Sequence, residues 1–384
     1  MINRIPYGMV GGAYTAFIGD VHRKAIAFDP RPALAAGCFS PRPDINSETG
    51  AICSVDPARV YADYRTMAER ESARPDGIKF VSITTPNNTH YDIAKCFLEH
   101  GIHVVCEKPL CFTVAQAEEL VALTAANGLL FAVAYSYSGY TMVKAMKEMI
   151  AAGKIGEVLN VNAEYPQEWL IDEIDPQASD TAKFSGWRSD PNVAGISNCC
   201  GDIGTHIEHT VHYLTGLKIK RLLATTNAFG KALDMNDNII VEYENGANGA
   251  YWASQIACGN LNGLWVRIYG TLGSFEWDQH YPDYVRFTPK GRPTEVLSRG
   301  TGYLSGAAAA NNRLPPGHPE GLYVGFANLY RNFIGALEKK VAGQTPDTSD
   351  LDFPTVADGL SGVRFVHAVV ESAARDSAWI VLNQ

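Results

Sequence analysis

The sequence predicts an α/β protein in which a doubly wound parallel sheet is followed by a domain with a large open, mainly antiparallel sheet. Two observations carry this prediction. In the first third of the chain, short apolar runs alternate with helical patterns, as crossover connections between parallel strands require. After about residue 136, apolar runs follow one another with turn signals such as Glu244-Asn245-Gly246 between them, which is typical of antiparallel strands.

The elements of the first part follow in a regular order. We expect strands at residues 5–10, 33–39, 79–84, 102–106 and 129–134, with helices at 14–28 and 91–100. A capping box, Thr113-x-x-Gln116, opens a further helix that runs to Gly128. The 384 residues are enough for two domains. We place the first at residues 1–135 and the second at 136–384, with the C-terminal helix able to pack back on the first.

The second part combines strands with covering helices. We expect strands at residues 155–165, 221–227, 238–244, 249–256, 264–269 and 275–278, and helices at 142–152, 204–214 and 322–339. Residues 299–319, rich in Gly, Ala, Asn and Pro, indicate a long loop of the functional or mobile kind. Apolar residues on both faces of this sheet, namely Tyr251, Ile256, Trp265 and Ile268, lead us to expect a homo-oligomer, a dimer or a tetramer.

Composition excludes several classes of protein. The net charge of −9 and the lack of a Lys/Arg run argue against a nucleic-acid partner. No apolar run reaches the roughly 18 residues of a membrane span, and Asp20 stands where a signal peptide would be cleaved. We therefore expect a cytoplasmic protein. Eight cysteines without a C-x-x-C pair indicate reduced core thiols.

Residues 8–19, GMVGGAYTAFIG, join the first expected strand to the first helix. Alone, this stretch fits a dinucleotide fingerprint and a plain turn about equally. At the first βα turn of a doubly wound sheet, however, the loop lies where a pyrophosphate rests on a helix N-terminus. The expected cofactor contacts here are Gly11, Gly12, Ala13, Thr15, Ala16 and Phe17.

The second expected strand ends without the carboxylate that usually binds the ribose of NAD. Ser40 can hydrogen-bond either cofactor, and Arg42 can pair with a 2′-phosphate or simply face solvent. NAD and NADP therefore both remain open, and we expect weak discrimination between them.

Two further segments follow strands of the same sheet. Cys106-Glu107-Lys108-Pro109 directs a lysine toward the cofactor crevice, unless Lys108 is only a surface lysine beside a turn. The segment 85–90 either caps the next helix through Asn88 or presents polar groups to the nicotinamide. The expected cofactor contacts from these segments are Thr85, Pro86, Asn87, His90, Glu107 and Lys108.

Asp202 and His206 are four residues apart, so a helix would place both on one face. A histidine suits proton transfer, and a nearby carboxylate can orient its ring or polarise a hydroxyl. The alternative is a helix cap and a packed core histidine. His206, His209 and His212 share a helix but lack companion ligands, so we expect no metal.

These motifs together resemble the glucose–fructose oxidoreductase/inositol dehydrogenase/MocA (Gfo/Idh/MocA) family over essentially the whole chain. The resemblance rests on the glycine-rich turn, T-P-N-x-x-H, E-K-P and D-x-x-x-H in that order. It implies a Rossmann domain, a C-terminal α/β domain and a catalytic set of Lys108, Asp202 and His206. Gly186-Trp187-Arg188 and residues 314–321 are similar to a subgroup acting on sugars or cyclic polyols, whose first turn has glycine where this chain has Ala13 and Thr15.

The resemblance implies an NAD- or NADP-dependent dehydrogenase that oxidises a sugar, anhydrosugar, glycoside or inositol hydroxyl. His206 would take the hydroxyl proton, Lys108 would stabilise charge on the oxygen, and Asp202 would orient His206 or a hydroxyl. A nucleotide-sugar ketoreductase and a catalytically silent dinucleotide-binding sensor are the alternatives. Trp187 and Arg188 join the expected cofactor contacts, and Trp169 flanks the crevice. The expected substrate contacts are Lys108, Tyr137, Tyr165, Gln167, Asp202, His206, Arg313 and His318.

Overall fold

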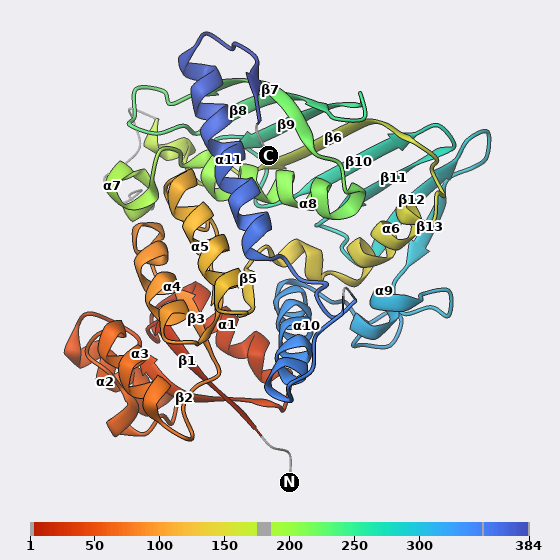
Figure 1. Cartoon of the computed structure of the whole chain (residues 1–384). Helices are drawn as coiled ribbons and strands as arrows, with labels where there is room; N and C mark the ends of the chain where they lie inside the picture. Colours follow the sequence, from red (N-terminus) through yellow and green to blue (C-terminus); the bar gives the residue numbers. More distant parts are fainter. Residues whose placement is uncertain (1–3, 175–185, 348, 383–384) are drawn as a thin grey trace. The chain divides into compact units, whose positions relative to one another are not determined.

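The computed structural model describes residues 4–174, 186–347 and 349–382 (Figure 1). The chain divides into two compact units. The first consists of Met1–Gly139 and Leu322–Leu360, and the second of Tyr140–Gly321 and Ser361–Gln384. Whereas the sequence placed a single boundary after residue 135, residues 322–360 group with the first unit.

The first unit contains a five-stranded parallel sheet in the order β2-β1-β3-β4-β5, so the predicted doubly wound sheet is confirmed. Each predicted strand is present within a few residues of its expected ends. The strands are β1 (Ile5–Gly11), β2 (Pro32–Cys38), β3 (Phe80–Thr84), β4 (His103–Cys106) and β5 (Phe131–Val133).

The helices of this sheet are α1 (Phe17–Ala27), α2 (Pro43–Ile52), α3 (Tyr64–Ala73), α4 (His90–Glu99) and α5 (Val114–Ala126). The predicted capping box of α5 is present. The Thr113 hydroxyl oxygen accepts the backbone N–H of Gln116, and the Gln116 side-chain oxygen accepts the backbone N–H of Thr113. Sequence patterning missed α2 and α3. Asp63 caps α3 by accepting from both the backbone N–H and the hydroxyl of Thr66, an arrangement that satisfies donors otherwise left unpaired.

Helix α10 (Leu322–Val341) completes the core of the first unit. Its Phe333 ring lies 5.4 Å from that of Phe80 on β3 and is fully buried. Truncating such a side chain to alanine costs about 3–5 kcal/mol. Part of the core of the first unit is thus supplied from far along the chain, and α1 and α10 pack on each other.

The second unit contains a nine-stranded sheet in the order β13-β12-β11-β10-β6-β9-β8-β7-β14. Among the described strands of this sheet, only β6 and β9 pair in parallel, so the predicted mainly antiparallel sheet is confirmed. Sequence patterning missed the three strands that come last in chain order. The strands are β6 (Val158–Pro166), β7 (Ile219–Asn227), β8 (Asn236–Tyr243), β9 (Asn248–Ser254), β10 (Trp265–Gly270), β11 (Gly273–Asp278), β12 (Tyr284–Pro289), β13 (Glu295–Ser298) and β14 (Ile380–Val381).

Helices cover one face of this sheet (Figure 1). Tyr251 on β9 and Ile268 on β10 point to that face and are buried, whereas Trp265 lies on the opposite face and Ile256 lies beyond the end of β9. Apolar residues of this set thus lie on both faces of the sheet as expected, although Ile256 lies outside the strands. The helices are α6 (Thr141–Ala151), α7 (Pro191–Ala194), α8 (Thr205–Thr215), α9 (Gly306–Asn311) and α11 (Val356–Ala374).

The expected loop 299–319 is not structureless, because it contains α9. Buried Arg299 organises it by donating to Asp283 Oδ1 and to the carbonyl oxygens of Leu314 and His318. Arg299 also lies 3.1 Å from the buried Glu320 carboxylate. A buried ion pair is favourable only when its remaining donors are also hydrogen-bonded, and here the backbone carbonyl oxygens accept from Arg299.

Two further expectations concern the state of the cysteines and the presence of membrane-spanning helices. All eight thiols are unpaired, but Cys258 is exposed, so the expectation of core thiols is wrong at that position. None of the described helices is long and apolar enough to cross a membrane.

Candidate active site

The glycine-rich turn between β1 and α1 needs glycine at two consecutive positions. Gly11 and Gly12 have φ values of +80° and +70°, in the left-handed region that residues with a side chain rarely adopt. Ala13 and Thr15 are outside that region. The two departures from the family's glycines therefore cause no backbone strain.

Close packing of the turn against α1 also requires glycine. A Cβ built on Gly19 would lie 2.2 Å from the Cα of Gly12. Among the described residues, no side chain caps the amino end of α1 at Ala16. Its first backbone N–H groups can therefore bind an anion such as a pyrophosphate. Phe17, at the first position of α1, is 71% exposed beside this end.

A cavity of about 430 Å³ lies at the carboxyl ends of β1, β2 and β3. Gly11, Ser40, Thr85 and Pro86, four of the predicted cofactor contacts, line it. The cavity also exposes two carboxylates that the sequence analysis did not single out, and both come from the starts of helices. They are Asp63 and Asp92.

Arg42, the candidate for a 2′-phosphate, is not among the residues that line this cavity. Its guanidinium donates to the Asp44 carboxylate at 2.7 Å, and both side chains are largely exposed. Ser40 accepts the backbone N–H of Arg42 at 3.2 Å. Water screens an exposed pair of this kind, so it contributes little to stability and a phosphate could displace it.

His90 connects the two segments that follow β3 and β4. Its ring nitrogens lie 2.9 Å from the carbonyl oxygens of Thr85 and Pro109. Burial lowers the pKa of His90, which favours a neutral ring. A neutral imidazole has one N–H, so it donates to one of these two carbonyl oxygens, and the ring lies between the segment after β3 and Pro109, the residue next to Lys108 in the chain.

Lys108 lies two residues after the end of β4, with its side chain half-buried, as expected from its place at the carboxyl edge of the sheet. The preceding residue, Glu107, is buried and accepts from the His22 ring at 2.8 Å and from the backbone N–H of Lys108 at 3.2 Å. His22 in turn bonds Tyr330 at 2.6 Å. Burial acts to raise the pKa of the Glu107 carboxyl, but the hydrogen bond and charge of His22 leave that pKa below its usual range. Glu107 therefore supports the backbone at Lys108 as a buried carboxylate.

In the second unit, Asp202 and His206 lie on either side of a change in helix type. Cys200–Gly204 form a π-helical turn that runs directly into α8. Such turns are rare and often accompany functional sites. The Asp202 carboxylate is partly exposed and accepts from Gln255 Nε2 at 3.0 Å. His206 is nearly buried, with its ring 6.1 Å from that of Tyr165.

The other two histidines of α8 point to different partners. The rings of His209 and Tyr213 are stacked 6.1 Å apart. His212 Nδ1 donates to the Leu217 carbonyl oxygen beyond the end of the helix. The rings of His209 and His212 thus do not converge with that of His206 on one point.

The remaining predicted contacts fall in several places. In the first unit, Tyr137 is buried in the turn Ser136–Gly139. In the second unit, Gln167 bonds Trp169 and Asn262, and Arg188 lies 3.9 Å from Asp202. Arg313 and His318 belong to the loop that Arg299 and Glu320 organise. The side chain of Trp187 lies outside what the structure describes.

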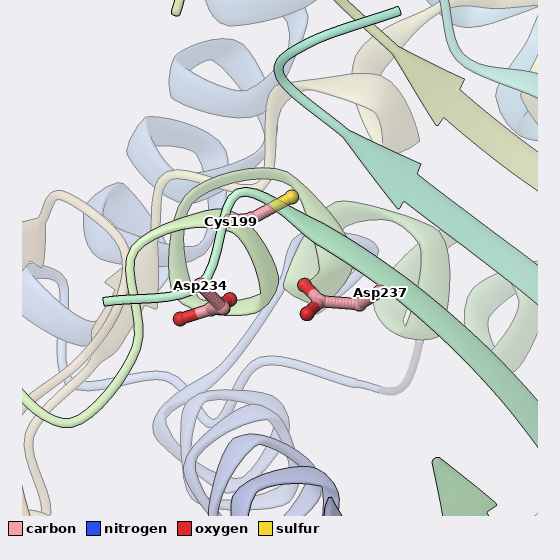
Figure 2. Close-up of side chains that lie close together, drawn as sticks. All are labelled: Cys199, Asp234 and Asp237. Carbon is pink, nitrogen blue, oxygen red and sulfur yellow. The ribbon is translucent and has the colours of Figure 1, made fainter. Parts of the chain in front are cut away.

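One group among the described residues has ligand types and spacing that could hold a metal ion. One ligand atom from each of Cys199, Asp234 and Asp237 lies within 4.8 Å of the others (Figure 2). However, Asp234 already accepts three hydrogen bonds, from Ser197 Oγ and from the backbone N–H groups of Asn198 and Cys200. Burial also raises the pKa of the Cys199 thiol, which opposes the thiolate that a metal needs.

Asp237 differs from Asp234 in its surroundings. Its side chain is fully buried, and neither oxygen has a hydrogen-bond partner among the residues described. Burial, followed by the negative charge of Asp234, raises the pKa of Asp237 well above its usual range. A proton on Asp237 removes one of the two negative charges without a metal.

Comparison with known proteins identifies the family to which the chain belongs. The model of the oxidoreductase family with an NAD-binding Rossmann fold matches residues 5–135, and that of the GFO/IDH/MocA C-terminal domain matches residues 143–276. The uncharacterised oxidoreductase YfiI of Bacillus subtilis is 36% identical, over 97% of this chain and 96% of its own. Levoglucosan dehydrogenase of Pseudarthrobacter phenanthrenivorans is 26% identical, over 98% of both chains.

Solved structures agree in fold over the full length. An inositol dehydrogenase homologue from Azotobacter vinelandii, in complex with NADH and myo-inositol, is 37% identical, with a TM-score of 0.89. The match covers 99% of this chain and 98% of that one. The same homologue with NAD+ gives 38% identity and a TM-score of 0.91. The chain therefore belongs to the Gfo/Idh/MocA family of oxidoreductases, with an NAD-binding Rossmann fold in its first unit.

Proposed function

We propose that this enzyme oxidises a secondary hydroxyl of a sugar or cyclic polyol to a ketone, with NAD as hydride acceptor. The observation that carries the proposal is the full-length similarity to an inositol dehydrogenase homologue with bound NADH and myo-inositol. Lys108, Asp202 and His206 occur in this chain at the family's motif positions. The similarity to levoglucosan dehydrogenase supports the same substrate class.

The first unit offers the groups that would hold the cofactor. The uncapped amino end of α1 and the turn at Gly11 and Gly12 suit the pyrophosphate. The cavity lined by Ser40, Thr85 and Pro86 suits the adenosine half. Bound nicotinamide supplies the site that accepts the hydride.

Three side chains take part in the proposed reaction. His206 accepts the proton of the substrate hydroxyl, a role for which an imidazole is suited near neutral pH. Lys108 donates a hydrogen bond to the same oxygen and stabilises its negative charge as the hydride leaves carbon. Asp202 accepts a hydrogen bond from a neighbouring donor and fixes the substrate or the His206 ring.

The finer points of substrate binding and assembly belong to the same proposal. Tyr165 next to His206, and Arg188 next to Asp202, suit the C–H and O–H faces of a ring-shaped substrate. We also propose that the enzyme is a homo-oligomer that works in the cytoplasm, where its eight unpaired thiols stay reduced.

The test is a panel of inositols, monosaccharides, anhydrosugars and nucleotide sugars, each assayed with NAD and with NADP for formation of the reduced cofactor. The proposal expects turnover of at least one polyol or sugar without a nucleotide. Turnover of nucleotide sugars alone would favour a biosynthetic ketoreductase. Tight NADH binding with no turnover across the panel would favour a sensor. Either result overturns the proposed function.

A further inference from the structure

A chain of buried amides connects Asp202 to Asp234. Gln255 Nε2 donates to Asp202 Oδ2 at 3.0 Å, and Asn198 Nδ2 donates to Gln255 Oε1 at 2.7 Å. The backbone N–H of Asn198 donates to Asp234 Oδ1 at 2.8 Å. Gln255 is fully buried and Asn198 nearly so, whereas Asp202 reaches the surface of its unit. Neither amide residue was singled out by the sequence analysis.

The direction of these hydrogen bonds fixes which way each amide points. Asn198 Nδ2 also lies 3.4 Å from the Asp234 carbonyl oxygen, so its NH2 group faces two acceptors. Gln255 must therefore turn its oxygen to Asn198, and this turns its own NH2 group to Asp202. A reversed Gln255 would set its oxygen against the Asp202 carboxylate and its NH2 group against the NH2 group of Asn198.

The backbone at both amides is also held. Gln255 follows β9, and its N–H donates to the Met235 carbonyl oxygen at 2.8 Å. The Asn198 carbonyl oxygen accepts the backbone N–H of Asp202 at 2.8 Å. Three separate segments thus converge near the Asp202 carboxylate. Leaving a buried donor in such a network without its hydrogen bond is costly.

Arg188 is a cation close to the Asp202 carboxylate. Its Nε lies 3.9 Å from Oδ2, and its side chain is 42% exposed. Exposed pairs contribute little to orientation, because water screens them and the long side chain keeps its freedom. The buried amide is therefore better placed than Arg188 to hold the carboxylate in one position.

We infer that Gln255, oriented by Asn198, is a positioning residue that holds the Asp202 carboxylate in its working orientation. The inference rests on the proposed function, because it gives Asp202 a part in the reaction. Gln255 touches neither substrate nor cofactor in this role. It acts through Asp202, with the buried Asp234 as the fixed end of the chain.

The experiment compares Gln255→Leu and Gln255→Glu with a matched control, Gln279→Leu, on the best polyol of the panel. Gln279 bonds the backbone N–H of Leu264 in another part of the second unit. We expect Gln255→Leu to lower kcat on the order of 10–100-fold, as loss of an orienting partner commonly does, with a much smaller change in the KM for NAD. Gln255→Glu places an acceptor against Asp202 and should be at least as slow. Gln279→Leu should keep the wild-type kcat.

A second pair of variants tests the route through Asn198. Asn198→Ala should lower kcat in the wild-type background and add little in the Gln255→Leu background, because both changes release the same amide. Additive effects would overturn the route through Asn198. Wild-type kcat in Gln255→Leu would overturn the inference while leaving the proposed function intact.

A structural readout keeps the inference independent of turnover. In a crystal structure of the folded Gln255→Leu protein, the Asp202 carboxylate should leave its wild-type rotamer or lose its order. An unchanged carboxylate would overturn the inference even if no substrate of the wild-type enzyme is found. A wild-type protein without turnover would count against the proposed function alone.

Discussion

Gly12 and Gly19 are packed so closely that a Cβ on Gly19 would lie 2.2 Å from the Gly12 Cα. The first turn of α1 thereby lies directly against the backbone of the glycine-rich turn. Gly19 thus meets a steric requirement of the kind that the third glycine of a dinucleotide fingerprint meets, close packing of helix on strand. The glycines missing at positions 13 and 15 are not needed for it.

Gly19→Ala should therefore weaken NAD binding at least tenfold and lower the midpoint of thermal unfolding, because the helix must move away from the turn. Titration of NADH fluorescence and a thermal melt measure the two effects. Gly335→Ala is the control, since it lies in α10 with no atom within 4 Å of the added Cβ. It should leave NAD binding unchanged and stabilise the fold by up to about 1 kcal/mol. Equal NAD affinity in both variants would contradict the assignment.

Lys108→Ala and His206→Ala should each lower kcat at least ~100-fold, the usual size for a positioned proton-transfer or charge-stabilising group. The dissociation constant for NADH should change much less. Exposed Lys220→Ala and His280→Ala make the same chemical changes elsewhere and should keep wild-type rates. Near-normal turnover in either site variant removes that residue from the catalytic set.

Cofactor choice should depend on Arg42 and Asp63. Arg42→Ala should weaken use of NADP and leave use of NAD nearly intact, because only a 2′-phosphate would draw Arg42 from Asp44. Asp63→Asn should raise kcat/KM for NADP relative to NAD, because it removes a negative charge from the cavity wall. Asparagine caps helices as well as aspartate does, so α3 should persist. The wild type should discriminate within about tenfold. If Arg42→Ala impairs both cofactors equally, Arg42 has a structural role only.

The buried carboxyl pair predicts a dependence of stability on pH. The pKa of Asp237 is raised in the folded protein, so from about pH 4 upward the folded state holds a proton that the unfolded state has lost. The free energy of unfolding should therefore fall with rising pH, by at most about 1.4 kcal/mol per pH unit from this group, until the raised pKa is passed. Asp237→Asn should remove this part of the slope and keep the protein stable at neutral pH.

Asp234→Asn is the matched comparison for Asp237→Asn. Its side-chain NH2 group would face donors whose hydrogen bonds the Asp234 carboxylate now accepts. It should lose about 1–3 kcal/mol at every pH. Thermal melts between acidic and neutral pH measure both variants. A stoichiometric metal in the purified protein that is lost in Asp237→Asn would contradict a protonated acid at this position.

Assembly should involve the uncovered face of the nine-stranded sheet. A row of residues that pair between neighbouring strands crosses this face, with Arg267 in its middle. Ile240 and Val296 lie near the two ends of this row, and both are exposed. Tyr269 on the same face is 40% exposed. Tyr269→Asp should shift the protein toward the monomer in light scattering, because a charge would be buried in an apolar contact. Tyr281→Asp, at an exposed turn, should not. A monomeric wild type at micromolar concentration would contradict an interface on this face.

The sequence was sufficient where structure depends on near neighbours. The five strands of the first unit, the turn at Gly11 and the capping box at Thr113 all follow from local patterns, and all are present. Helix α3 was missed because its low apolar content hides the period, although Asp63 is a recognisable cap.

The candidate site was less predictable because its support comes from distant segments. Asp202 and His206 were found by their spacing, but the π-helical turn between them was not. That turn forms where Asp234, more than thirty residues further along the chain, accepts three donors from its start. Gln255 lies 53 residues from Asp202 and carries no motif. Only the folded sheet brings these partners together.

The central claim is that a carbinol hydride passes from the substrate directly to the nicotinamide. The most direct measurement uses a polyol deuterated at the carbinol carbon and mass spectrometry of the reduced cofactor. The account predicts that the reduced cofactor carries the deuterium and that turnover slows when chemistry limits the rate. Reduced cofactor without deuterium, formed at the same rate from labelled and unlabelled polyol, would contradict it.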